Sequence, residues 1–287
     1  MYILGSLVAE VLKVLASIKQ GHQLRGDAEV LGFARNPEFD GRLILAGAEE
    51  FTIADGVTFT VAGPMQPELL ALQQKHDEFL REQRERPRSG ESALAAYVDK
   101  SVPNLSSIVV LAKSGRKRML LTGDARGDKI LQGLELAGAL APGAAMHVDV
   151  LKVPHHGSTN NLDRDFFTRI TADHYVLSGN GQHGNPERET FAMLLEARGS
   201  DPFELHLTYP IEEIDAARRL DWQNEQAKER TKKAKGRRTK DPRPDWSPKK
   251  HSLAAFFTKD RLGRGQELRI ADETAPHVID LGDPLRF

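Results

Sequence analysis

The chain has 287 residues, a formal net charge of −1, 39% hydrophobic residues and no cysteine. This length and composition suffice for one large or two modest cores, and the balanced charge excludes long-range attraction to nucleic acid as a property of the whole chain. The lack of thiols excludes disulfides and thiolate metal sites, so any metal must be held by His, Asp or water, and it favours a cytoplasmic protein.

The N-terminal stretch, residues 3–18, is predicted to be an amphipathic packing helix. Its apolar residues recur at helical spacing, and Glu10 and Lys13 interrupt the apolar face. The stretch is too short to span a bilayer and lacks the basic segment and cleavage site of a signal peptide. We therefore expect no association with a membrane.

The region that follows predicts short strands and one helix. Residues 22–39 are expected to be irregular, with one short strand at 28–31. Further strands are expected at residues 42–45, 50–53 and 57–61. A helix is expected from 67 to about 84, and the charged stretch 81–100 is expected to form a mobile loop or an insertion.

Residues 106–112 and 118–122 predict two apolar strands joined by a turn, and the second strand ends at Gly123 and Asp124. A carboxylate at the end of a buried strand is costly to bury unless a cation or hydrogen-bond donors pair with it. Asp124 is therefore either a site residue or the cap of a helix that is expected at 126–136.

A buried strand predicted at residues 148–153 runs directly into Pro154, His155, His156 and Gly157. Neutral imidazole is the commonest metal ligand among side chains, and a rigid strand end can hold it in place. The alternative is that one histidine is buried and hydrogen-bonded while the other is solvated. The pair alone fixes neither the number of ligands nor their geometry.

The order LLTGD, helix, strand, LKVPHHGS, helix, strand, SGN, within residues 43–208, resembles the second half of a metallo-β-lactamase-fold hydrolase. It is most similar to the domain of ComEC-type DNA-uptake proteins. The resemblance implies an α/β fold, an incomplete αββα sandwich. It also implies that Asp124 bridges two divalent metal ions, zinc or manganese, and that His155 or His156 completes one metal site.

The same resemblance implies supporting roles for other residues. Ser158 is expected to hydrogen-bond to a ligand histidine, and Asn104 matches a position close to the metal site, although a turn or cap explains it equally well. His183 lies in the Gly-rich loop 178–186, between strands expected at 174–177 and 203–207. The family usually places a His directly before Pro, and the shifted His183 is a candidate for substrate contact or a solvated loop residue.

The main metal motif of that family, HxHxDH or HxDxDH, occurs nowhere in the chain. At most two or three of the usual ligands are present, and a dinuclear centre needs more. Because the family continues upstream of a helix like that at 3–18, the chain is expected to be a fragment, a truncated reading frame or one half of a split protein.

The C-terminal part departs from the resemblance. Residues 212–230 are predicted to be helical, and residues 228–240 hold eight basic residues and one acidic residue, which is typical of a solvated segment or of a phosphate-contacting arm. A Pro-rich linker and strands at 267–270 and 277–281 follow. We expect a partial metallo-β-lactamase-like domain (1–210), a helical and basic linker (211–250) and a small C-terminal extension (251–287).

The implied function is a metal-dependent hydrolase that acts once a missing half is supplied, with a phosphodiester such as nucleic acid as substrate. The alternative is an inactive remnant or a binding and regulatory protein. In either case, a partner chain or self-association is expected to cover the open sheet.

Overall fold

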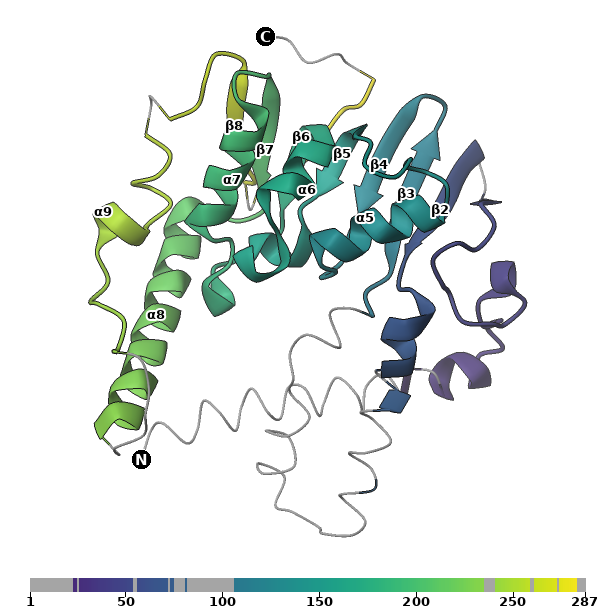
Figure 1. Ribbon diagram of the computed structural model, residues 1–287, viewed down its shortest axis with the longest axis horizontal. Helices are drawn as coiled ribbons and strands as arrows, with labels where there is room; N and C mark the ends of the chain where they lie inside the picture. Colours follow the sequence, from purple (N-terminus) through teal and green to yellow (C-terminus); the bar gives the residue numbers. More distant parts are fainter. Residues whose placement is uncertain are drawn as a thin grey trace.

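The computed structural model describes residues 23–24, 26–53, 56–71, 73–74, 81, 106–234, 241–258, 261–272 and 274–282. An eight-stranded sheet, with its strands side by side in chain order, forms the centre of a mixed α/β fold (Figure 1). The strands are β1 (Phe51–Thr52), β2 (Val57–Gly63), β3 (Val109–Ser114), β4 (Lys117–Leu121), β5 (Met146–Lys152), β6 (Ile170–Leu177), β7 (Phe203–Leu207) and β8 (Gln266–Ile270). Strands β1 to β4 are antiparallel, and β4 to β8 are parallel.

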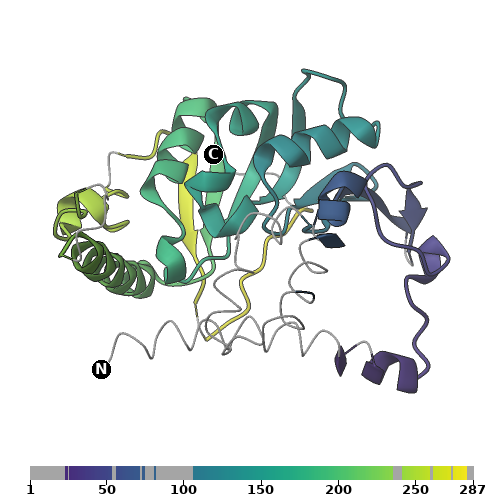
Figure 2. The same cartoon turned by 60° about the horizontal axis from the view of Figure 1, so that its bottom comes forward.

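Three helices cross over between the parallel strands: α5 (Gly127–Leu136), α6 (Arg164–Arg169) and α7 (Arg188–Arg198). Each new parallel strand is added on the same side of the previous one, so connections of one hand place all their helices on one face of the sheet. Figure 2 shows these helices above the sheet and the segment that follows β8 beneath it.

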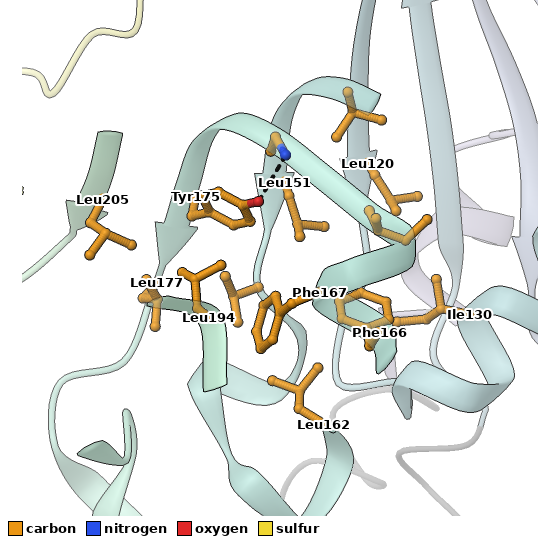
Figure 3. Packing of buried hydrophobic residues seen from close by; sticks show 14 of the residues in the cluster. Leu120, Ile130, Leu151, Leu162, Phe166, Phe167, Tyr175, Leu177, Leu194 and Leu205 are labelled. Carbon is orange, nitrogen blue, oxygen red and sulfur yellow. Dashed lines mark hydrogen bonds between the residues drawn. The ribbon is translucent and has the colours of Figure 1, made fainter. Parts of the chain in front are cut away.

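The hydrophobic core lies between the sheet and these helices (Figure 3). Leu151, Phe166 and Tyr175 are fully buried in it. The hydroxyl of Tyr175 accepts a hydrogen bond of 2.9 Å from the backbone N–H of Ala172, and burial raises the pKa of Tyr175 to about 12. The phenol therefore stays neutral, and its polar atom is satisfied within the core.

Helix α8 (Ile211–Ala234) begins in the core and extends away from it, and residues 241–258 return alongside it, including α9 (Pro248–His251). Side chains of α8 hold the return segment: Trp222 Nε1 donates to the carbonyl of Pro244, and Gln226 Nε2 donates to the carbonyl of Arg243, both at 2.8 Å. The chain then re-enters the core and adds β8 to the edge of the sheet. The predicted C-terminal extension thus contributes a strand to the main sheet.

Most predicted elements from residue 106 onward are confirmed: the hairpin β3–β4, helices α5, α6 and α8, and strands β5 to β8. None of the helices among the described residues is both long and apolar enough to cross a membrane.

Some predictions fall on residues outside the described ones. These are the helix at 3–18, the site residue Asn104, and most of the stretches 81–100 and 235–240.

Three predicted strands are wrong. Residues 26–30 are helical rather than extended at 28–31, and this helix ends at Gly32, whose φ of 74° suits a helix terminus. A short apolar run does not distinguish a helix from a strand. Residues 42–45 form no strand, and residues 277–281 form none because that segment lies against the face of the sheet, where it has no strand edge to pair with.

Replacing Gly133 with Ala tests the close packing of α5 on β2. A Cβ atom at this position would lie 1.7 Å from the carbonyl oxygen of Ala62. Helix propensity alone predicts a gain of about 1 kcal/mol, but overpacking costs roughly 1–3 kcal/mol and a backbone oxygen cannot rotate away. We expect Gly133→Ala to lower the free energy of unfolding in urea by about 2 kcal/mol.

The matched control is Gln132→Ala, at the exposed neighbouring position of the same helix. It should change the free energy of unfolding by no more than about 0.5 kcal/mol. A stabilised Gly133→Ala protein would mean that α5 does not approach β2 this closely.

Candidate functional site

The candidate site lies at the carboxyl ends of β4, β5 and β6. The loop at 122–126 follows β4, the turn η3 (Pro154–Gly157) follows β5, and a loop from Ser178 follows β6. Parallel strands bring their carboxyl ends to one edge of the sheet, where open α/β sheets bind ligands. The motifs TGD, HHGS and SGN are therefore neighbours in space.

Asp124 and His156 face each other at this edge. Asp124 Oδ1 lies 3.6 Å from His156 Nε2, and both side chains are partly exposed. The other ring nitrogen of His156, Nδ1, lies 3.1 Å from the carbonyl oxygen of Ser178. A carbonyl only accepts, so this bond calls for a proton on Nδ1 and leaves Nε2, on the side of the carboxylate, as the nitrogen that could bind a cation. Two acceptor atoms at this separation attract a cation.

Lys152 places one positive charge at the same point. Its Nζ donates to the carbonyl of Gly123 at 2.7 Å and lies 3.9 Å from Asp124 Oδ1. Burial lowers the pKa of Lys152, and the carboxylate of Asp124 acts in the opposite direction. The site therefore combines one carboxylate, one ammonium group and one imidazole.

The backbone of the histidine loop is strained. His155 and His156 have φ values of 45° and 54°, in the left-handed region, and Gly157 follows with a φ of 81°. Each non-glycine residue there costs about 1–2 kcal/mol. The carbonyl of Gly123 accepts from the N–H of His155 at 3.1 Å, and the carbonyl of Gly157 accepts from Thr190 Oγ1 at 2.7 Å. Such enforced strain is typical of functional sites.

His155 is held differently from His156. Its Nδ1 lies 2.9 Å from Asn161 Oδ1, and Asn161 Nδ2 donates to the backbone carbonyl of Asp124 at 3.2 Å. The amide of Asn161 thus connects the loops that follow β4 and β5. Of the two histidines that the sequence left as alternatives, His156 is the one whose ring faces the carboxylate of Asp124.

The other predicted site residues lie elsewhere. Ser158 is buried, and its hydroxyl donates to Glu187 Oε1 at 3.5 Å, so the expected bond to a ligand histidine is corrected. His183 lies in η5 (Gln182–Gly184), which packs against α8. The structure adds residues that sequence reasoning missed, namely Lys152, Asn161 and Ser178. Lys152 and Ser178 belong to the quoted motifs and could have been found there.

The fold and site define a mixed α/β protein with polar side chains gathered at the ends of its central strands. No protein-family model matches the chain, and no solved structure matches it. Microtubule-associated protein 1A from Homo sapiens is 36% identical over 76 residues, which are 26% of this chain and 3% of that protein. The same protein from Rattus norvegicus and from Mus musculus is 37% identical over 67 residues, 23% of this chain and 2% of theirs. Matches this short do not show a family.

The strain at His156 predicts an unusual order of stability between two variants. His156→Gly and His156→Ala both remove the imidazole, but only glycine adopts the left-handed conformation without steric cost. Allowing for the greater freedom of glycine in the unfolded chain, we expect His156→Gly to be more stable than His156→Ala by roughly 0.5–1 kcal/mol in urea unfolding.

The same pair of substitutions at Gln132, within α5, provides the control. There glycine should be less stable than alanine by about 1 kcal/mol, the reverse order. If alanine is also the more stable residue at position 156, the histidine loop does not carry the strain described.

Proposed function

We propose that the chain supplies one half of a metallo-β-lactamase-type hydrolase centre, with Asp124 and His156 as metal ligands. The approach of Asp124 Oδ1 to His156 Nε2, at 3.6 Å on adjacent strand ends, carries this proposal. Two ligand atoms on one tetrahedral ion with bonds near 2.0 Å are separated by roughly 3.3 Å. The pair therefore fits one edge of a metal site.

Two ligands do not complete a catalytic centre. A dinuclear site needs several protein ligands and an open position for water, and the chain has no HxHxDH or HxDxDH motif. We propose that a complementary half, in an upstream segment or a partner chain, supplies the other ligands. The proposed substrate is a phosphodiester, by analogy with the resembled family.

Bound zinc or manganese would lower the pKa of a coordinated water to about 7 and polarise the phosphoryl oxygen. Asp124 would orient the attacking water by accepting its hydrogen bond, and the bond from His156 Nδ1 to Ser178 would hold the imidazole in its ligating form. Lys152 would place an ammonium group near the anionic substrate, and His155 would take up the proton released by the attacking water and pass it to the leaving oxygen.

A binding or regulatory function is the second candidate, and the position of Lys152 favours it. The ammonium group already offsets the charge of Asp124 at 3.9 Å. In that case, Lys152, Asp124, His156 and Ser178 form a polar network that joins three strand ends without a metal. Binding of metal at this edge distinguishes the two candidates.

The test uses the full chain with Mn²⁺ or Zn²⁺ and bis-p-nitrophenyl phosphate, with and without a chain that carries an HxHxDH half. We expect Asp124→Asn and His156→Gln each to lower kcat/KM roughly 100-fold, because each removes one metal ligand. The control is Asp173→Asn, a partly exposed carboxylate on β6 that pairs with His147. It should leave kcat/KM unchanged.

Paramagnetic broadening of the His156 ring signal by Mn²⁺ gives a readout that does not depend on turnover. Loss of this broadening in Asp124→Asn supports the shared site. Undiminished hydrolysis in that variant contradicts the proposal. Broadening without hydrolysis in the presence of the complementary half favours the binding function, and two metals bound by this chain alone at the ends of β4 to β6 would show that the count of missing ligands is wrong.

A further inference from the structure

A second group of potential metal ligands lies on the face of the sheet opposite the helices. Phe203, Leu205 and Leu207 of β7 are buried in the core, so the alternating residues Glu204 and His206 point to the other face. His174 of β6 is the register partner of Glu204. The pairing of two parallel strands thus brings two imidazoles and one carboxylate together.

Three ligand atoms of this group form a nearly equilateral triangle. His174 Nδ1 lies 3.0 Å from His206 Nε2 and 3.3 Å from Glu204 Oε2, and His206 Nε2 lies 3.2 Å from Glu204 Oε2. A tetrahedral zinc ion with bonds near 2.0 Å separates its ligand atoms by roughly 3.3 Å. The triangle therefore has the size of one face of a zinc coordination sphere.

Two of the three ligands also have the outer partners that metal ligands require. His206 Nδ1 lies 2.8 Å from His277 Nε2, and Glu204 Oε1 accepts a hydrogen bond of 3.0 Å from Arg269. With His277 Nε2 as the acceptor, the proton of His206 lies on Nδ1 and its Nε2 is left to bind a cation, and a bond to the second oxygen orients a carboxylate. Nε2 and Oε2 are thereby directed into the triangle.

The three ligands are shielded from solvent. The side chains of His174, Glu204 and His206 are 8%, 14% and 3% exposed. A buried carboxylate is costly unless a cation or hydrogen-bond donors offset its charge, and an ion in the triangle would supply that positive charge.

A cavity of about 250 Å³ adjoins the triangle, and its lining includes Arg269, His277 and Asp280 besides the three ligands. Its lining places it between the sheet and residues 277–280. Figure 2 shows this segment beneath the sheet. The cavity has room for several water molecules. A fourth coordination position on this side would be open to water or to a small anion.

We propose that His174, Glu204 and His206 bind one divalent transition-metal ion, zinc or an ion of similar preference, with a fourth position open to this cavity. Two histidines and one glutamate form a ligand set that catalytic zinc sites use. This site shares no ligand with the strand-end site, which is formed by Asp124 and His156. It does not depend on the proposed hydrolase function. Through His277 it also ties the segment after β8 to the sheet.

The test measures binding of Zn²⁺ by calorimetry and the visible absorption of Co²⁺, which is intense only in tetrahedral sites. The starting protein is the full chain with Asp124→Asn and His156→Gln, so that the strand-end site does not contribute. We expect one bound ion, a tetrahedral Co²⁺ spectrum, and a higher unfolding temperature with Zn²⁺. Adding Glu204→Gln and His206→Gln should abolish all three.

His277→Ala tests the outer partner without disturbing the core, because His277 is exposed. We expect it to weaken Zn²⁺ binding by about 10–100-fold. His147→Gln, at an exposed histidine of β5 that pairs with Asp173, is the control and should leave binding unchanged.

A starting protein that binds no ion, or a folded Glu204→Gln/His206→Gln variant that keeps the Co²⁺ spectrum, overturns the proposal. In the first case the cluster is a hydrogen-bonded polar group without metal. If the double variant does not fold, His277→Ala decides, and unchanged affinity in that variant counts against the site.

Discussion

Parallel pairing of β4 to β7 is the constraint on which both candidate sites depend. The pairs Leu120 with Leu151 and Tyr175 with Leu205 fix the register of neighbouring strands, and all four side chains are fully buried. Burying each such side chain stabilises the fold by roughly 1.5–3 kcal/mol, so a slip of register would be costly. This register places the three loops with polar motifs at one edge and brings His174 opposite Glu204.

A local irregularity in β6 decides which side chains reach the opposite face. Ala172 and Tyr175 are both fully buried although they are three residues apart, so the alternation of side chains shifts by one position between them. The N–H of Ala172 then donates to the Tyr175 hydroxyl. Downstream of the shift, Tyr175 faces the helices and His174 faces the other side. A fully buried core contact therefore positions a candidate metal ligand.

The sequence predicted the strand-end site because its signals are local. Apolar runs that end in TGD and HHGS identify strands followed by polar loops, and strand ends converge in any parallel sheet. Which histidine faces Asp124 could not be predicted, because it depends on left-handed backbone conformations at His155 and His156 and on the Asn161 amide. The group of His174, Glu204 and His206 was not predicted, for a different reason. His174 and Glu204 are thirty residues apart, and only the register of β6 and β7 brings them together.

The charges at the strand ends constrain any complementary half. Asp124 contributes one negative charge and Lys152 one positive charge 3.9 Å away, so the two charges offset each other and leave no net negative charge to attract a divalent ion. The side chain of Lys152 is only 20% exposed and is bonded to the carbonyl of Gly123, so its ammonium group stays near an incoming ion and repels it. To bind two divalent metal ions, this site would need further carboxylates and neutral imidazoles from a complementary half. A complementary half with an acidic, His-rich motif meets this requirement, whereas one that offers only neutral polar groups does not.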